Sequence, residues 1–193
     1  MNKPIIGKIE KLVLSACKKK TNYYGMDACK YHLIPVVKNA KILAKKLKAD
    51  EEIIEIAAWF HDYSCIVNKK FYPEHHFHSS RLAENFLIKE KYPKNRIEHI
   101  KSCIFTHRAS KKIKKESLEA KILASADAMA HLEYINDLFH LAFTTHKLGT
   151  EKGTKFVYKK INQSWKKMMP EAKKMMRKRY EAIRTILDGL QEN

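Results

Sequence analysis

The sequence predicts an all-α protein, and three observations carry that prediction. Apolar residues recur at spacings of three and four, the period of an amphipathic helix, in segment after segment. Only five glycines and five prolines occur in 193 residues, which argues against a β-rich protein with many tight turns. Hydrophobic residues make up 45% and charged residues 31%, so the chain has enough apolar side chains to bury one core. We therefore expect a single domain, residues 1–193, of roughly six to nine helices.

The first two helices are predicted from their apolar stripes. Residues 4–19 carry isoleucine, leucine and valine on one face, followed by lysines at the favourable C-terminal end. A second helix begins near Ala28 or His32 and runs to Leu47. Pro35 lacks a backbone N–H, so we expect a break or kink there, with His32 at a helix start.

The third helix has a clear beginning and a distinctive end. Asp50 is a good N-cap, and Glu51 and Glu52 suit the first turn. The helix then runs through apolar residues to Phe60.

Further helices follow a predicted loop over residues 63–72. Pro73 can stand at the first position of the fourth helix, which ends at Tyr92-Pro93. Periodic isoleucines predict a fifth helix over residues 94–109.

The last third of the chain predicts one long helix and two basic ones. Ser117 begins a sixth helix whose apolar series continues to Leu138. Gly149 and Gly153 are expected to bracket a turn. Residues 154–189 predict two basic amphipathic helices that cover the domain.

The four cysteines show no C-x-x-C spacing and lie within or beside predicted helices. We expect Cys17, Cys29, Cys65 and Cys103 to be reduced and unpaired. The N-terminal residues have neither the apolar core nor the cleavage site of a secretory leader. No apolar run approaches the roughly 20 residues that a membrane span needs. We therefore expect a cytoplasmic protein that uses no membrane.

The net charge of +18 is consistent with a nucleic-acid surface or a polyanionic substrate. The excess is mostly lysine, however, and it is spread along every segment rather than gathered in one arginine-rich stripe. Such a distribution favours an ordinary solvated surface, and it leaves nucleic acid open as a partner.

The stretch Ala57-Ala58-Trp59-Phe60-His61-Asp62 is the most informative one in the chain. It places an imidazole and a carboxylate side by side at the buried end of a helix. An ionised group away from water needs a partner, because an isolated buried charge is costly. Carboxylate and neutral imidazole are both good ligands for a divalent metal, which makes a metal the natural partner.

The neighbouring segments extend this pattern. His32 lies upstream in a Tyr-His-Leu-Ile-Pro segment, and Asp127 lies downstream within the long sixth helix. This order, His, then His-Asp, then Asp, resembles the HD-domain superfamily of metal-dependent phosphohydrolases. The segments 73–83, with His75, and 100–108, with His107, are similar to the next two histidine segments of that superfamily. The resemblance covers about residues 30–135.

The resemblance implies a fold and a metal site. It implies a helical HD-type bundle with a motif core over about 28–146 and covering helices over about 154–189. It also implies that His32, His61, Asp62 and Asp127 hold one divalent ion. Such a mixed nitrogen and oxygen set suits Mn, Fe, Ni, Co or Zn, with Mg also open.

His75 and His107 are implied either to bind a second metal or to contact substrate phosphate. No acid besides Asp62 stands out as a bridging ligand, so we favour one tightly bound metal, with both histidines and Arg108 contacting phosphate. A guanidinium fork matches phosphate oxygens. The other six histidines fit no ligand spacing: His76, His78, His99, His131, His140 and His146.

The resemblance implies a metal-dependent phosphohydrolase that acts on a nucleotide or another small phosphate ester. The metal would lower the pKa of a bound water, and Asp62 would orient or deprotonate that water. His75 or His107 would stabilise the developing charge or protonate the leaving oxygen. Two alternatives stay open: a nucleic-acid-binding protein and a regulatory HD-type protein without turnover. The sequence does not define the oligomeric state.

Overall fold

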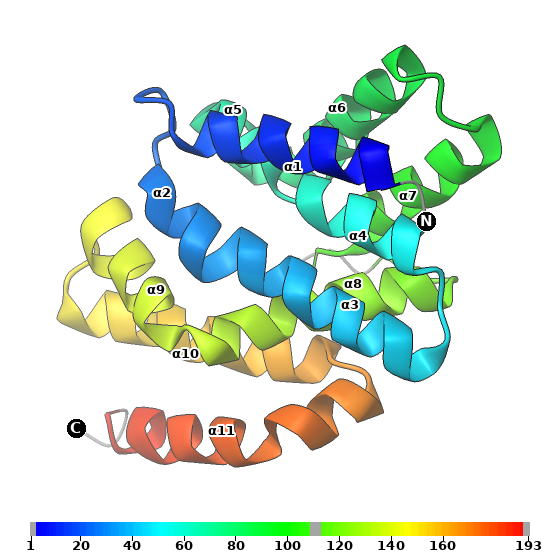
Figure 1. Ribbon diagram of the computed structural model, residues 1–193. Helices are drawn as coiled ribbons and strands as arrows, with labels where there is room; N and C mark the ends of the chain where they lie inside the picture. The colour runs from blue at the N-terminus through cyan, green and yellow to red at the C-terminus, as the bar shows by residue number, and fades with distance from the viewer. Residues whose placement is uncertain (1–2, 109–112, 191–193) are drawn as a thin grey trace.

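The computed structural model describes residues 3–108 and 113–190, and these residues contain helices and no strand (Figure 1). Nine of the α-helices in this part of the chain have six residues or more, so the all-α prediction is confirmed. The α-helices are α1 Lys3–Cys17, α2 Gly25–Ala28, α3 Ile34–Leu47, α4 Glu51–Phe60, α5 Tyr63–Val67, α6 His75–Lys89, α7 Lys94–Thr106, α8 Leu118–Glu133, α9 Ile135–His140, α10 Thr150–Lys167 and α11 Pro170–Gly189. Three short non-α turns join them: η1 Cys29–Leu33, η2 Lys69–Glu74 and η3 Leu141–Thr145.

Helix α8 lies at the centre of the arrangement. It packs against α3, α4, α7, α10 and α11. Small side chains on several faces let these neighbours approach closely, and five of them are almost fully buried: Ala120, Ala124, Ala126, Ala128 and Ala130. A helix that is apolar all round belongs in a core rather than at a surface. Asp127 therefore sits in the middle of a buried helix, as the sequence predicts.

The start of α4 is fixed by the predicted cap. The Asp50 carboxylate accepts hydrogen bonds from the backbone N–H groups of Glu52 and Ile53, at 3.1 and 3.0 Å. Arg96 of α7 donates two further hydrogen bonds to the same carboxylate, at 2.9 and 3.1 Å. These contacts satisfy helix-end donors and join α4 to α7. With its beginning held in this way, α4 ends at Phe60 and presents His61 and Asp62 at its C-terminal end.

The expected irregularity near Pro35 takes a specific form. The chain passes through a π-helical turn, Cys29–Leu33, before α3 begins with Pro35 in its first turn. Proline has no backbone N–H to donate to the preceding turn, and the helix is π-helical immediately before it. The prediction that His32 stands at a helix start is wrong, because the backbone is helical without a gap from Gly25 to Leu47 and His32 lies on the π-helical turn within it. Such turns are frequent at functional sites.

Three predicted boundaries are wrong. The predicted loop over 63–72 contains α5 and the 3₁₀ turn η2, so α6 begins at His75 rather than at Pro73. The long sixth helix stops at Glu133, and the series to Leu138 continues on a separate helix, α9. Gly153 lies inside α10, where a Cβ would come within 2.2 Å of the Phe143 ring. The residues of α5 are mostly buried, and Gly153 packs against Phe143, so tertiary contacts favour helix at both places where local signals indicate a loop or turn.

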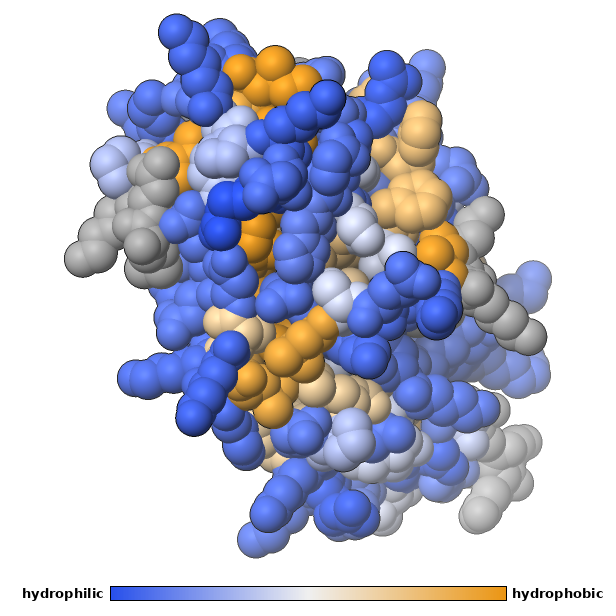
Figure 2. Space-filling model, turned by 90° about the vertical axis from the view of Figure 1, so that its right-hand side faces the viewer, coloured by the Kyte–Doolittle hydropathy of each residue, from blue (hydrophilic) through white to orange (hydrophobic). Residues whose placement is uncertain are grey.

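Helices α10 and α11 lie along one side of α8 and bring the end of the chain there (Figure 1). Both are amphipathic, and their apolar faces bury residues such as Val157, Ile161, Met176 and Leu187. Figure 2 shows one face of the molecule, mostly hydrophilic with small separate apolar patches. Across the described residues, none of the helices has the length and apolar character needed to traverse a bilayer.

The prediction of four unpaired cysteines is wrong for Cys17 and Cys29. A disulfide joins them, with their Cα atoms 6.3 Å apart, and it ties the end of α1 to η1. Both cysteines are buried in the hydrophobic core. Cys65 and Cys103 are free and buried. Helical periodicity places all four thiols in the core, but the pairing depends on how α1 meets η1, which the sequence does not show.

We expect unreduced, denatured protein to titrate two thiols, and four after reduction. Because the bond closes a loop of 12 residues, reduction should lower the free energy of unfolding by about 3 kcal/mol. Denaturant unfolding with and without a thiol reductant measures the change. Cys17→Ala is the control, since reductant should leave its stability unchanged. Four thiols in the unreduced protein would contradict the pairing.

Candidate metal centre

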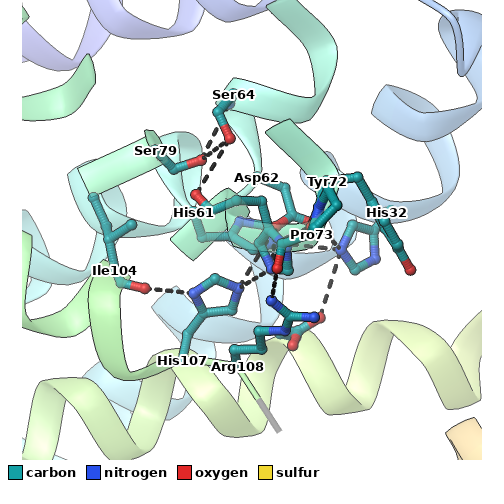
Figure 3. A network of polar contacts seen from close by, with 12 residues as sticks. His32, His61, Asp62, Ser64, Tyr72, Pro73, Ser79, Ile104, His107 and Arg108 are labelled. Carbon is teal, nitrogen blue, oxygen red and sulfur yellow. Dashed lines mark hydrogen bonds and ion pairs between the residues drawn. The ribbon is translucent and has the colours of Figure 1, made fainter. Parts of the chain in front are cut away.

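The centre of the site is the Asp62 carboxylate, which follows α4 directly. The Nε2 atoms of four histidines lie within 3.7 Å of its oxygens. In Figure 3, His32 and His107 lie on opposite sides of Asp62. The two carboxylate oxygens face different partners and so divide the site into two donor groups.

The first donor group consists of His32, His61, Asp127 and the Oδ2 atom of Asp62. His32 Nε2 lies 3.2 Å from His61 Nε2, 3.4 Å from Asp62 Oδ2 and 3.5 Å from Asp127 Oδ1. His61 Nε2 lies 3.7 Å from Asp62 Oδ2. The structure therefore brings together all four residues that are predicted as metal ligands. They come from η1, the end of α4 and the middle of α8.

The second donor group consists of His75, His107 and the Oδ1 atom of Asp62. The two Nε2 atoms lie 3.4 and 3.5 Å from Oδ1 and 3.3 Å from each other. Asp62 Oδ1 is buried, and no described residue donates a hydrogen bond to it. A buried carboxylate oxygen without a hydrogen-bond donor destabilises the folded protein, and a bound cation would offset that cost.

Three of the histidines are oriented by the same kind of hydrogen bond to the backbone. The Nδ1 atoms of His61, His75 and His107 lie 2.7, 2.8 and 2.5 Å from the backbone carbonyl three residues earlier. A carbonyl only accepts, so each Nδ1 must carry the hydrogen and donate it. In the neutral ring, Nε2 is then an unprotonated acceptor that points into the site. Metal-binding histidines are usually held this way.

This orientation has a consequence for the second donor group. With Nδ1–H committed to backbone carbonyls, neither His75 nor His107 can donate from Nε2 while it is neutral. Two nitrogen lone pairs and a carboxylate oxygen then face one another. These electron-rich atoms repel one another, and a metal ion between them would remove the repulsion.

Burial and charge keep these groups in the forms that bind metal. Burial lowers the pKa of His61 to about 4, and burial likewise lowers that of His75 to about 4, so both rings are neutral near pH 7. Burial alone would raise the pKa of Asp62, but the adjacent His61 and His75 hold it well below its usual range.

Asp127 is held from two sides. Its Oδ1 faces His32, and its Oδ2 accepts from the Lys167 ammonium of α10. Burial alone would raise the pKa of Asp127, but Lys167 and His131 hold it well below its usual range. Lys167 is itself almost completely buried, so this contact orients the carboxylate and leaves Oδ1 free for the first donor group.

A small polar cavity of about 80 Å³ opens beside the two donor groups. Three cationic side chains line it, Arg108, Lys160 and Lys167, together with Asp62, Tyr72, His75, His107, Asp127, His131, Gln163 and Ser164. Arg108 also donates to the carbonyl oxygen of Pro73. Three cations around a small cavity are suited to an oxyanion.

Several residues at the site were not nominated from the sequence. His131 was assigned no role, yet its ring stacks on His32 with centroids 5.1 Å apart, and its Nε2 lies 3.7 Å from Asp127 Oδ1. The i, i+4 spacing from Asp127 could have indicated this shared face. Lys160 and Lys167 belong to a polar stripe on α10. Because lysines are abundant along the whole chain, these two do not stand out in the sequence.

The donor set fits a divalent metal. Ligand atoms about 2.1 Å from one ion lie roughly 3.0 to 3.4 Å apart, close to the separations within both donor groups. Imidazole and carboxylate donors suit transition metals from Mn to Zn. Cys65 lies near Asp62 and His75 and offers a further possible donor, although burial raises the pKa of its free thiol.

Fold and site together define an all-helical protein with a buried histidine–aspartate centre. The family model described as "HD domain" matches residues 30–132, more than half of the chain. The chain therefore belongs to the HD-domain family, as the motif order predicts.

Two solved structures share the fold. A protein from Lactobacillus plantarum aligns with a TM-score of 0.74 at 19% identity, covering 97% of this chain and 95% of its own. A predicted HD superfamily hydrolase from an uncultured Thermotogales bacterium aligns with a TM-score of 0.57 at 22% identity, covering 80% and 84%. No curated protein sequence matches the chain.

We expect the metal-free protein to lose stability as the pH falls from about 6.5 towards 4. In that window His61 and His75 each take up a proton in the unfolded chain, whereas the folded protein keeps both rings neutral. Burial alone would lower the pKa of His32, but Asp62 and Asp127 raise it, so His32 acts in the opposite direction. Melting temperatures of chelator-treated protein at several pH values measure the net effect.

His61→Asn should flatten this pH profile. His78→Ala, which removes a histidine outside the centre, should leave it unchanged. A melting temperature that does not fall across the window in the wild type would contradict the neutral, buried imidazoles.

Proposed function

We propose that the protein is a metal-dependent phosphohydrolase that acts on a nucleotide or another small phosphate ester. The observation that carries this proposal is the shared Asp62 carboxylate, with one donor group at each of its two oxygens and a cation-lined cavity next to it. Membership of the HD-domain family supports the same class of chemistry. One of the similar structures is described as a predicted HD superfamily hydrolase.

We propose that His32, His61, Asp62 and Asp127 hold one divalent ion. His75, His107 and Asp62 would hold a second, so that Asp62 is the bridging ligand. The sequence favours a single ion because no bridging acid besides Asp62 stands out. The geometry supports a second ion because Asp62 Oδ1 is buried without a donor between two unprotonated nitrogens.

When bound, divalent ions lower the pKa of a coordinated water and withdraw charge from a phosphoryl oxygen. The protein would supply the rest. Arg108, Lys160 and Lys167 would bind the phosphate oxygens and stabilise the charge that grows on them. Asp62 would orient the attacking water. The largely closed surroundings would strengthen each of these interactions by limiting access of bulk water.

We propose that residues 1–193 work as one HD-type domain, with a motif core over about 28–146. The covering helices over about 154–189 would do more than shield the core. Lys160 and Lys167 both come from α10, so the phosphate-binding cavity would be incomplete without that helix.

The other predictions from the sequence concern partners and location. Nucleic-acid binding through the basic surface, a regulatory role without turnover and a cytoplasmic location all stay predictions. Retained binding to heparin by metal-free protein would favour nucleic acid. Bound metal without phosphate release from a broad ester panel would favour a regulatory protein.

Metal analysis tests the centre directly. We expect two ions per chain in the wild type, about one in His107→Ala and Asp127→Ala, and almost none in Asp62→Ala, because only Asp62 serves both donor groups. His78→Ala, on the same helix as His75, is the matched control and should keep both ions. Wild-type occupancy in Asp62→Ala and Asp127→Ala would contradict the assignment of both residues as metal ligands.

Phosphate binding can be tested separately from metal binding. Lys160→Met should weaken inhibition of ester hydrolysis by inorganic phosphate about tenfold, because it removes one charge from the polar cavity. Lys159→Met, the exposed neighbour on the same helix, is the control. Metal content should not change in either variant. Equal phosphate inhibition in both would contradict the role of Lys160.

A further inference from the structure

A second cavity, of about 100 Å³, also reaches the metal centre. Most of its lining is apolar: Tyr24, Ala28, Leu33, Cys65, Ile66, Tyr72, Leu138 and Leu141, with polar groups from His32, Asp62, His131, Asp137 and Lys160. Asp62, Tyr72, His131 and Lys160 line both this apolar cavity and the polar one. The two cavities therefore adjoin at the centre.

The charges are distributed unequally between the cavities. Arg108, Lys167 and Asp127 line only the polar cavity, while Asp137 lines only the apolar one, so the excess of cations lies in the polar cavity. Asp137 makes no side-chain hydrogen bond or ion pair with another described residue, and burial raises its pKa. A carboxylate at this place repels phosphate and accepts hydrogen bonds from an uncharged group.

Two tyrosines form one wall of the apolar cavity. The rings of Tyr24 and Tyr72 lie with centroids 6.3 Å apart at an angle of 39°. Aromatic faces of this kind pack well against a flat ring.

The wall that carries Tyr24 is held in place before any ligand binds. The Cys17–Cys29 disulfide closes the segment at both ends. The buried Asn22 donates from Nδ2 to the carbonyl oxygens of Cys17 and Gly25, at 3.1 and 2.8 Å. Gly25 has φ +67, a backbone conformation that glycine adopts without strain. A preformed wall reduces the ordering cost of binding.

We propose that the apolar cavity binds the organic part of the substrate, and that this part is a small, uncharged ring bearing a hydrogen-bond donor that faces Asp137. This inference rests on the proposed function, because it takes the phosphate to lie in the polar cavity. The separation of charges then sets the direction of binding, with phosphate towards Arg108 and Lys167 and the ring towards Tyr24 and Asp137. Both cavities are far smaller than the ~300–1,000 Å³ of typical ligand pockets, which favours a compact ester.

Equilibrium binding of two non-hydrolysable ligands tests the ring. Phenylphosphonate and methylphosphonate share a head group and differ in the ring. Calorimetry on the metal-loaded full chain should give at least tenfold tighter binding for phenylphosphonate. Tyr24→Ala should reduce this advantage to less than threefold. Leu141→Ala, at a half-buried position of the same lining, is the second variant and should also reduce it.

Phe77→Ala is the control, since Phe77 is an exposed aromatic residue that does not line the cavity. It should keep the full ring advantage. Metal content, measured in each variant, should match the wild type.

Asp137 is tested with a third ligand, 3-hydroxyphenylphosphonate, which adds a hydrogen-bond donor to the ring. The hydroxyl should tighten binding to the wild type, and Asp137→Ala should remove that gain without changing the affinity for phenylphosphonate. No gain in the wild type would overturn the assignment of Asp137.

The outcomes separate this inference from the proposed function. Equal affinity for phenyl- and methylphosphonate, or an unchanged ring advantage in both Tyr24→Ala and Leu141→Ala, would overturn the ring-binding cavity and leave the phosphohydrolase standing. Failure of both phosphonates to bind, with no phosphate released from any ester, would overturn the proposed function, and this inference with it.

Discussion

The structure depends on a single half-buried carboxylate that serves two groups of histidines. Asp62 is an acid at the end of an apolar helix, and the burial of its Oδ1 atom would be unfavourable without compensation. Its neighbours His61, His75 and His107 come from different parts of the chain, and each is turned towards Asp62 by its own backbone hydrogen bond. The fold places three helix ends at one point so that one carboxylate can be shared. A cation completes that arrangement more readily than a proton does.

The central position of α8 follows from the same requirement. For Asp127 to reach the centre, its helix must lie deep inside the molecule, with neighbours on nearly every side. Alanines achieve this because they let adjacent helices approach closely without leaving cavities. Asp127 and His131 then project from one face towards His32. The polar atoms are tolerated in a core because Lys167 and Ser164 of α10 satisfy them, through an ion pair and a 2.9 Å hydrogen bond.

Local signals in the sequence predicted the fold class, and the four residues predicted as metal ligands lie close together in the structure. The Asp50 cap, the irregularity before Pro35 and the His-Asp pair at a helix end are all encoded by neighbouring residues, and each appears in the structure. The Cys17–Cys29 bond and the contribution of Lys160 depend instead on how distant helices pack. Periodicity marks a residue as buried or exposed, but it does not identify the partner. His131 is intermediate, because its spacing from Asp127 was visible while its stacking on His32 was not.

The basic composition has two separate physical consequences. Most of the lysines behind the charge of +18 lie on solvated surfaces, where they act through a long-range field that attracts any anion and weakens with salt. Lys160 and Lys167 differ because they line a small cavity beside Asp62, where charges are less screened and positions are fixed. Net charge alone therefore cannot distinguish a nucleic-acid surface from a phosphate site. The distinction comes from α10, which points these two lysines inward while its other lysines stay exposed.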